Sequence, residues 1–318
     1  MELVHQSAVV ISDPNPYKKV EMAGRTCYKS PSDGTEEGAV KFTKRLIKSG
    51  HTAMLEHAVF CFEIYPVWKE DLLHPYIVQL CSEKFFNVTY RDGRMLVSAN
   101  VRAICGRNYR DPVYHALAGA YPDIVWEHQQ QKEWSSELPF KATIIDLERL
   151  DGLSMSEIAA HKHMTFRFVT NRGCSHEIVR HRPCSFAQES TRYVNYQDGL
   201  KIIYPADWDK WTEERKRSFV KAWEASEKYY GELIEAGCRP QEARAVLPIG
   251  LKTEIVVTAN LKEWAWIFDL RLFGTTGAPH PDIKHLMSLA FKEACKDSMI
   301  RTYFETMRLF QNQANGEE

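Results

Sequence analysis

One segment of the chain concentrates residues that bind anions. It spans residues 180–193 and combines hydroxyl side chains with one histidine and three arginines: His181, Arg180, Arg182 and Arg192. Arginine stays charged, and its planar fork of donors matches a phosphate or the edge of an ionised ring. Within the segment only Glu189 balances this charge, and Pro183 interrupts helical periodicity. We interpret the segment as a ligand-binding loop; a solvated helix face paired with neighbouring acids is the alternative.

The charge balance of the whole chain bears on the size of that ligand. The 318 residues are 44% hydrophobic and 26% charged, as expected for a globular protein with a large core, and the formal net charge is -1. Because the chain has no overall positive charge that would attract nucleic acid, we expect the ligand of this segment to be a small anion. The eight cysteines form no Cys-x-x-Cys pair, so we expect reduced thiols. Residues 1–12 lack a signal-peptide pattern and no apolar run is membrane-long, so we expect a cytoplasmic protein.

Hydrophobic periodicity predicts the strands and helices that must position this segment. Strands are expected where apolar residues alternate or β-branched residues gather, at 8–11, 59–64, 95–102, 165–169, 201–204 and 254–259. Helices are expected where apolar residues recur at helical spacing, at 17–27, 37–49, 69–80, 111–121, 171–179, 240–247, 262–272 and 282–311. A longer helix runs from Thr212, its N-cap, to Gly237, and the polar stretch 127–137 reads as an exposed helix or loop.

These elements indicate a mixed α/β (α+β) fold in a single domain, 1–318. About a hundred residues, 65–163, separate two strands of similar character, and we interpret them as an insertion within that domain. Residues 312–318 are expected to form a flexible tail.

Several residues outside the Arg-rich segment have both a functional and a structural interpretation. His51, Glu56 and His57 stand between a predicted helix end and a strand, where side chains project into clefts and where a helix dipole also favours histidine. Arg244 could equally pair with Glu242 or Glu235, and Arg271 lies near a helix end that favours any cation. His161 and His163 have no third ligand in sequence, so we predict no metal site.

The order Arg-His-Arg, seven residues, Ser190, then Arg192-Tyr193 resembles the signature of flavin-dependent thymidylate synthases. The resemblance implies a methyltransferase that converts dUMP to dTMP by reductive methylation. Methylenetetrahydrofolate would donate the carbon, FAD would carry hydride and NADPH would be the reductant. It also implies an antiparallel sheet flanked by long helices, with FAD bound at subunit interfaces of a homotetramer.

The resemblance carries roles onto matching positions of this chain. The implied cofactor-binding residues are His51, Glu56, His57, Arg180, His181, Arg182, Gln188, Asn260 and Lys262. The implied substrate-binding residues are Glu177, Arg180, Gln188, Glu189, Ser190, Thr191, Arg192, Arg244 and Arg271. Arg271 is also the implied catalytic residue, because its charge would stabilise the ionised uracil ring.

The chain departs from the family pattern at several of these positions. Lys262 replaces an arginine and loses its planar fork, and Ala53 replaces a hydroxyl residue that touches FAD. Glu177 replaces a glutamine, and Gln188 stands where the family has a glutamate, which is displaced to Glu189.

Two further interpretations concern the chemistry and the class of ligand. Cys184 lies between arginines that would favour a thiolate, but the family has a small apolar residue there, so we do not favour it as a nucleophile. A related methylase of another pyrimidine nucleotide, such as UMP, would use nearly the same residues. A nucleic-acid-binding module is a third possibility, in which binding falls steeply with salt.

Overall fold

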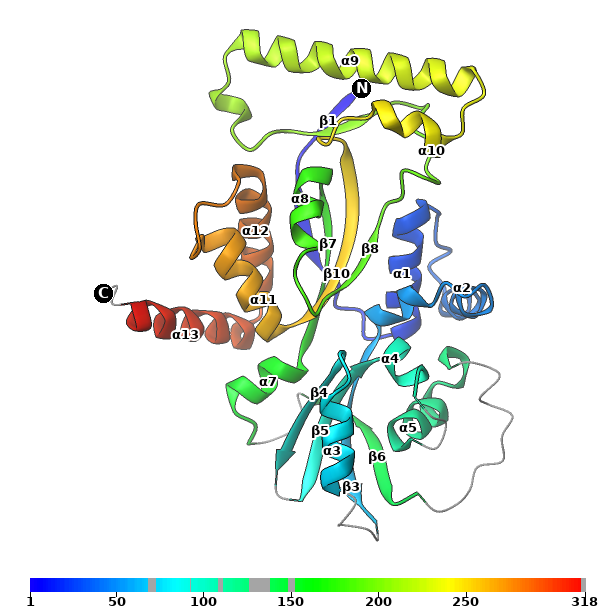
Figure 1. Cartoon of the computed structure of the whole chain (residues 1–318), viewed down its shortest axis with the longest axis vertical. Helices are drawn as coiled ribbons and strands as arrows, with labels where there is room; N and C mark the ends of the chain where they lie inside the picture. The colour runs from blue at the N-terminus through cyan, green and yellow to red at the C-terminus, as the bar shows by residue number, and fades with distance from the viewer. Residues whose placement is uncertain (68–72, 92, 108–110, 126–137, 148–151, 316–318) are drawn as a thin grey trace.

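The computed structural model describes the chain except for residues 68–72, 92, 108–110, 126–137, 148–151 and 316–318. Two four-stranded antiparallel sheets and one parallel pair of strands form its framework (Figure 1). The sheets follow one another along the long axis, and helices pack against both. The predicted mixture of helices and an antiparallel sheet is therefore present.

The central sheet has the order β2-β7-β10-β8, which are Ser7–Val10, His163–Asn171, Lys252–Asn260 and Ser185–Gln188. Alternation along its strands sends apolar residues to both faces. Phe166 and Phe168 join Ile255 and Val257 in a core that is closed by α11 (Leu261–Phe268) and α12 (Pro281–Ala294). Val256 and Ala187 point the other way, toward α1 (Pro16–Tyr28). The sheet is consequently covered on both faces.

The second sheet is built around β3 and the segment 65–163. Its order is β4-β5-β3-β6, which are Phe86–Arg91, Arg94–Asn100, Val59–Pro66 and Phe140–Ile145. It packs with α3 (Leu73–Cys81), α4 (Val101–Cys105) and α5 (Pro112–Ala120) in one core, which also takes in residues of α1 and of α2 (Glu36–Lys48). Two short 3-10 helices, η1 (Thr52–His57) and η3 (Pro122–Ile124), border this core, and α7 (Met155–His161) leads back to β7.

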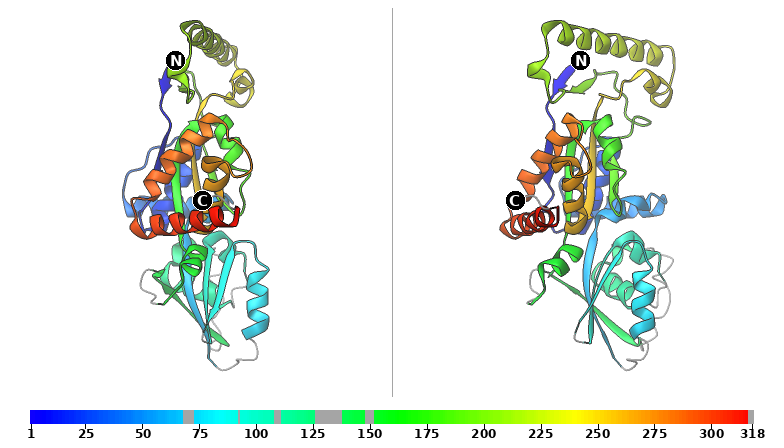
Figure 2. Two further views of the ribbon diagram at one scale, coloured as in Figure 1. Left: turned by 90° about the vertical axis from the view of Figure 1, so that its left-hand side faces the viewer. Right: turned by 60° about the vertical axis from the view of Figure 1, so that its left-hand side comes forward.

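The other end of the molecule carries the long helix α9 (Glu213–Glu235). The views in Figure 2 keep α9 and the second sheet at opposite ends of the long axis. The parallel pair β1 (Glu2–Val4) and β9 (Lys201–Ile203) lies beneath α9, as does the 3-10 turn η5 (Trp208–Lys210). The Thr212 side chain accepts a hydrogen bond from the backbone amide of Arg215, so the helix begins as predicted. Trp223 and Tyr230 lie on its apolar stripe and are buried.

Several predicted elements need correction. The single helix predicted at 282–311 is two helices, α12 and α13 (Ser298–Asn315), because Asp297 accepts from the first backbone amides of α13. That helix continues to Asn315, so the first part of the stretch predicted as a flexible tail is helical, and residues 316–318 lie outside the described residues. The strand predicted at 95–102 ends at Asn100, whose side chain caps α4. Strands β1, β4, β6 and β8 were not predicted, and the prediction for 127–137 lies wholly outside the described residues.

Helices α4 and α7 were not predicted, whereas three other predicted helices are present and have tighter or wider turns at their ends. The predicted helix 171–179 is α8 (Arg172–Ile178). The predicted helix 240–247 is α10 (Pro240–Ala243) followed by the 3-10 turn η6 (Arg244–Val246). The predicted helix 262–272 is α11 continued by one π-helical turn, η7 (Asp269–Phe273). Within the described part of the chain, no helix is long and apolar enough to cross a membrane.

Candidate functional site

Arg271 lies at the centre of the first group of site residues. Its guanidinium donates to Glu177 Oε2 at 2.7 Å and to His181 Nε2 at 3.1 Å. Glu177 lies on α8, His181 follows the end of that helix and Arg271 stands on η7, so two segments far apart in the sequence converge. Burial, with the charge of Arg271, lowers the pKa of His181 to about 4, so the imidazole is neutral and accepts the hydrogen bond. The guanidinium is thereby held in one direction while its side chain stays 22% exposed.

Arg192 and Arg244 form a second group at the other end of the Arg-rich segment. Arg244 donates to Thr191 Oγ1 at 3.3 Å, and Arg192 donates to Gln241 Oε1 at 3.1 Å. The Ser190 hydroxyl accepts from the backbone amide of Arg192 at 3.2 Å. Both arginines are exposed. Two guanidiniums beside two hydroxyls can bind a phosphate dianion.

His51 joins this second group through two tyrosines. Its Nδ1 lies 3.4 Å from the Tyr28 hydroxyl, and the Tyr28 and Tyr193 rings lie 5.1 Å apart. The Arg192 guanidinium lies 5.3 Å from the centre of the Tyr193 ring. An exposed surface of cations and flat rings thus surrounds Arg192.

Glu56 and Asn260 belong to a third group, which lines a recess between the two sheets. Pro183 and Cys184 of the Arg-rich segment border the same recess, which encloses about 20 Å³, little more than one water molecule. Asn260 begins α11: its Oδ1 accepts from the Glu263 amide at 2.8 Å, and its Nδ2 donates to the Ala160 carbonyl at 3.1 Å. So shallow a recess can hold only one edge of a ligand.

The three groups have no direct polar contact with one another. Among the described residues, no hydrogen bond or ion pair links a residue of one group to a residue of another. Arg180, Arg182 and Lys262 are exposed, as is Ala53 within η1. The residues that the sequence singled out are therefore neighbours within each group.

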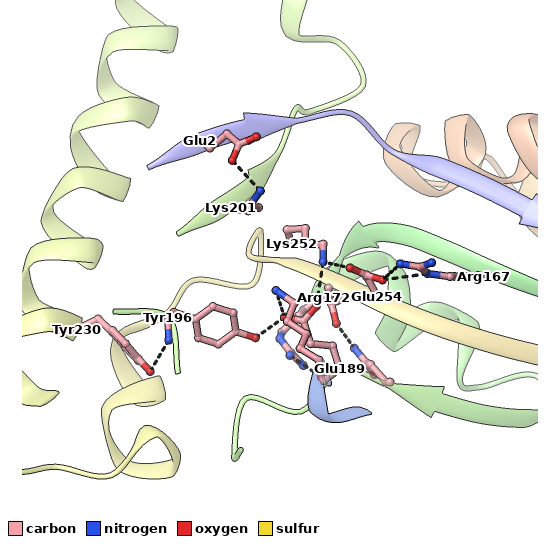
Figure 3. A network of polar contacts seen from close by, with 12 residues as sticks. Glu2, Arg167, Arg172, Glu189, Tyr196, Lys201, Tyr230, Lys252 and Glu254 are labelled. Carbon is pink, nitrogen blue, oxygen red and sulfur yellow. Dashed lines mark hydrogen bonds and ion pairs between the residues drawn. The ribbon is translucent and has the colours of Figure 1, made fainter. Parts of the chain in front are cut away.

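Glu189 requires a correction, because the structure does not offer it to a substrate. Its carboxylate is fully buried and accepts from Tyr196 Oη at 2.7 Å and from Lys252 Nζ at 3.0 Å, with Lys29 Nζ at 3.2 Å (Figure 3). Arg172 donates to its backbone carbonyl at 2.9 Å.

The physical reason is the alternation of side chains along a strand. Gln188 ends β8 and faces α8, where its amide donates to Ser175 Oγ at 2.8 Å and to Thr253 Oγ1 at 3.2 Å. The next residue, Glu189, must face the opposite side of the sheet, toward α1. Displacement of a glutamate by one position therefore moves it from one face to the other.

The sequence interpretation also missed the residues that hold Glu189. Lys252 and Glu254 stand two positions apart at the start of β10, and Arg167 on β7 pairs with Glu254 across the sheet (Figure 3). Charged residues two apart in an otherwise apolar strand share one face, and this pattern was the available signal.

His57 is buried rather than displayed. Its Nδ1 lies 2.9 Å from Thr258 Oγ1, and that hydroxyl lies 2.8 Å from Thr165 Oγ1. Burial lowers the pKa of His57 to about 4, so it is neutral at physiological pH. Its side chain is 1% exposed and lines, with Thr165 and Thr258, a cavity of about 150 Å³, so its contact with the cofactor stays a prediction.

Cys184 is buried, and burial together with the nearby Glu263 carboxylate raises the pKa of its thiol well above the ordinary value. A thiol with a raised pKa is a poor nucleophile, in agreement with its sequence interpretation. Glu263 itself was not predicted as a site residue. Burial raises its pKa to about 7, and its Oε1 has no hydrogen-bond partner among the described residues.

The described part of the chain contains no group of three or more histidine, cysteine or acidic side chains placed to bind a metal ion. His161 uses both ring nitrogens within the protein, with Thr89 Oγ1 at 2.9 Å and Ser98 Oγ at 3.0 Å. His163 Nδ1 lies 2.9 Å from the carbonyl of His161.

Comparison with known proteins places these groups in a family. A family model described as thymidylate synthase complementing protein matches residues 8–67 and 125–297. The unmatched residues between them lie inside the segment predicted to be an insertion. All three groups of site residues fall in the matched stretches.

Individual relatives agree with the family model. A flavin-dependent thymidylate synthase of Geobacter sulfurreducens is 35% identical over 127 residues, which are 39% of this chain and 54% of the relative. Another, of Pyrococcus abyssi, is 33% identical over 147 residues, 44% of this chain and 60% of the relative. The chain thus spans between half and two thirds of these curated relatives.

A solved structure of a UMP/dUMP methylase PolB from Streptomyces cacaoi, bound with 5-Br UMP, aligns over 96% of both chains with 14% identity and a TM-score of 0.45. That likeness is too distant to bear on the substrate of this chain. The family model, in contrast, matches well over half of the chain. The resemblance found in the sequence is therefore confirmed, and the chain belongs to the flavin-dependent thymidylate synthase family.

Proposed function

We propose that this protein methylates dUMP to dTMP, with methylenetetrahydrofolate as carbon donor, FAD as hydride carrier and NADPH as reductant. The observation that carries the proposal is the Arg271 guanidinium, which Glu177 and His181 hold in one direction on the surface of a family-matched stretch. A fixed cation whose side chain is 22% exposed is suited to stabilising negative charge on a ring that lies against it.

Each group of residues has a role in this proposal. Arg271 draws electron density from the pyrimidine and makes carbon 5 a better nucleophile. Arg192 and Arg244, with Thr191, hold the nucleotide phosphate. The recess at Glu56 and Asn260 receives one edge of FAD. The bound flavin supplies the hydride chemistry and the folate supplies the carbon. The protein supplies position and field.

We propose that the site is completed between the subunits of a homotetramer. Among the described residues, no hydrogen bond or ion pair links the Arg271 group to the Arg192–Arg244 group, which is compatible with a site that takes them from different copies. Arg180 and Arg182 are exposed and form no ion pair with the described residues, and the segment that carries them continues into Pro183 and Cys184 of the recess, which fits a flavin enclosed between subunits. The isolated chain would then be inactive.

The decisive test combines a spectrum with a turnover assay. Purified protein reconstituted with FAD should be yellow, and it should methylate dUMP when methylenetetrahydrofolate and NADPH are added. Preference for UMP over dUMP in the same assay would replace the substrate and keep the chemistry. A protein that stays colourless and binds nucleic acid with a steep salt dependence would overturn the proposal.

A further inference from the structure

The recess that contains Glu56 and Asn260 has a wall that comes from the 65–163 segment. Lys84, Phe85 and Asn87 line this wall, in the turn that joins α3 to β4 and at the start of β4. The family model does not match residues 68–124, so this wall is a feature of the present chain rather than of the family pattern.

The same segment also holds the two recess residues in place. Arg102 of α4 forms an ion pair with the Glu56 carboxylate. Asn260 Nδ2 donates to Asn87 Oδ1 at 3.5 Å, in addition to its bond to the backbone of α7. Contacts with the 65–163 segment therefore fix the orientation of the Glu56 and Asn260 side chains.

Lys84 and Phe85 differ from Arg102 and Asn87, because the Lys84 ammonium and the Phe85 ring remain available to a ligand. Lys84 is exposed, and within the described part of the chain its ammonium forms no ion pair and lies 5.5 Å from the centre of the Phe85 ring. Phe85 is half-buried, with part of its ring at the recess. A cation beside an aromatic ring suits a ligand that carries both phosphates and flat rings.

We propose that the Lys84–Phe85 turn binds one phosphate and one flat ring of FAD, so that the 65–163 segment forms part of the cofactor site. The proposal rests on the proposed function, since FAD is the dinucleotide expected at Glu56 and Asn260. The ammonium pairs with a phosphate oxygen and the phenyl ring packs against the flat ring. The recess encloses only about 20 Å³, so these contacts lie along its rim.

The test measures the affinity of the full-length apoprotein for FAD from the quenching of flavin fluorescence. Lys84→Ala and Phe85→Ala should each raise the Kd about tenfold, the size expected for one charge-assisted contact or one buried ring face. Lys84→Arg should restore most of the affinity. Lys141→Ala, which removes an exposed lysine of β6 that does not line the recess, should leave the Kd unchanged.

Equal FAD affinity in wild type, Lys84→Ala and Phe85→Ala would overturn the inference while leaving the proposed function intact. Failure of the wild type to bind FAD would instead overturn the proposed function. If Phe85→Ala does not fold, as circular dichroism would reveal, the comparison of Lys84→Ala with Lys84→Arg still decides the question, because Lys84 is exposed.

Discussion

Arg271 and Glu177 form an ion pair of 2.7 Å between residues 94 positions apart, which joins η7 to the end of α8. The pair fixes the direction of the guanidinium before any ligand arrives, and His181 supplies a second anchor. Preorganised donors of this kind act on charge that develops during a reaction without a cost of reorientation. The pair also places the Glu177 carboxylate beside the proposed nucleotide site. The roles of the Arg271 cation and of this carboxylate can be tested separately.

Replacement of Arg271 by alanine should abolish methylation and leave flavin bound. The change removes the cation that stabilises the ionised pyrimidine, and losses of about a hundredfold or more are usual when such a donor is removed. Steady-state turnover and the visible spectrum of the same preparation measure the two effects. Arg301→Ala, at an exposed arginine of α13, is the control. Turnover at the wild-type rate would refute the role of Arg271.

Glu177→Gln should strengthen nucleotide binding. Glutamine can still accept from Arg271 but does not neutralise it, so the guanidinium attracts an anionic ligand more strongly. The pair is partly exposed, at 22% and 26%, so the effect is limited to about threefold in Kd. Calorimetric titration with dUMP measures it, with the exposed Glu214→Gln as control. Weaker binding would mean that the carboxylate itself contacts the nucleotide.

Lys252→Met should destabilise the fold rather than impair chemistry directly. It removes the buried ammonium partner of the fully buried Glu189 carboxylate and leaves only the more exposed Lys29 beside it, and the loss of a buried partner costs about 3 kcal/mol. Urea unfolding measures the change in free energy. Lys201→Met removes an exposed partner of Glu2 in the neighbouring strand pair, and should cost less than about 1 kcal/mol (Figure 3). Equal losses in the two variants would contradict the burial argument.

Local pattern and long-range packing differ in what they reveal before a structure is known. The sequence pattern predicted β7 and β10, because apolar residues recur at every second position in each, as at Phe166 and Phe168 in β7. Strand β8 was missed, since four residues within an Arg-rich segment become a strand only through pairing with β10. The spacing of motifs led to Arg271 and Glu177, which do meet, whereas the burial of Glu189 depends on which sheet face α1 covers.

Acid should destabilise the protein between pH 6.5 and pH 4. Burial lowers the pKa of His57, His161 and His163 from 6.5 to about 4, as it does for His181, so the unfolded chain binds more protons than the folded chain in that window. Stability is therefore complete above pH 6.5 and falls as the pH drops, by about 1.4 kcal/mol for each unit of pKa shift and each histidine.

Unfolding by urea at pH 7 and pH 5 measures this dependence. His57→Gln, which can keep a hydrogen bond to Thr258, should reduce the difference between the two pH values. His5→Gln, at an exposed histidine, should not change it. Stability that is the same at both pH values in the wild type would show that these buried histidines are protonated in the folded state.

Two inactive variants should restore activity to each other. Arg271→Ala and Arg244→Ala remove cations that stand on η7 and η6 and do not touch within one chain. Arg244 is exposed and donates one hydrogen bond, to Thr191, so its loss should leave the fold intact. If a site takes Arg271 from one subunit and Arg244 from another, co-expressed variants form some sites in which both arginines are present.

Random assembly of equal amounts would give about a quarter of the wild-type activity, because a two-chain site receives the intact residue from each subunit at that frequency. Each variant expressed alone provides the baseline, and two differently tagged copies of Arg271→Ala provide the control for co-expression. Activity that stays at the baseline would place both arginines in a site formed by one chain. Activity near a quarter of the wild-type value would instead show that Arg271 of one subunit and Arg244 of another serve the same site.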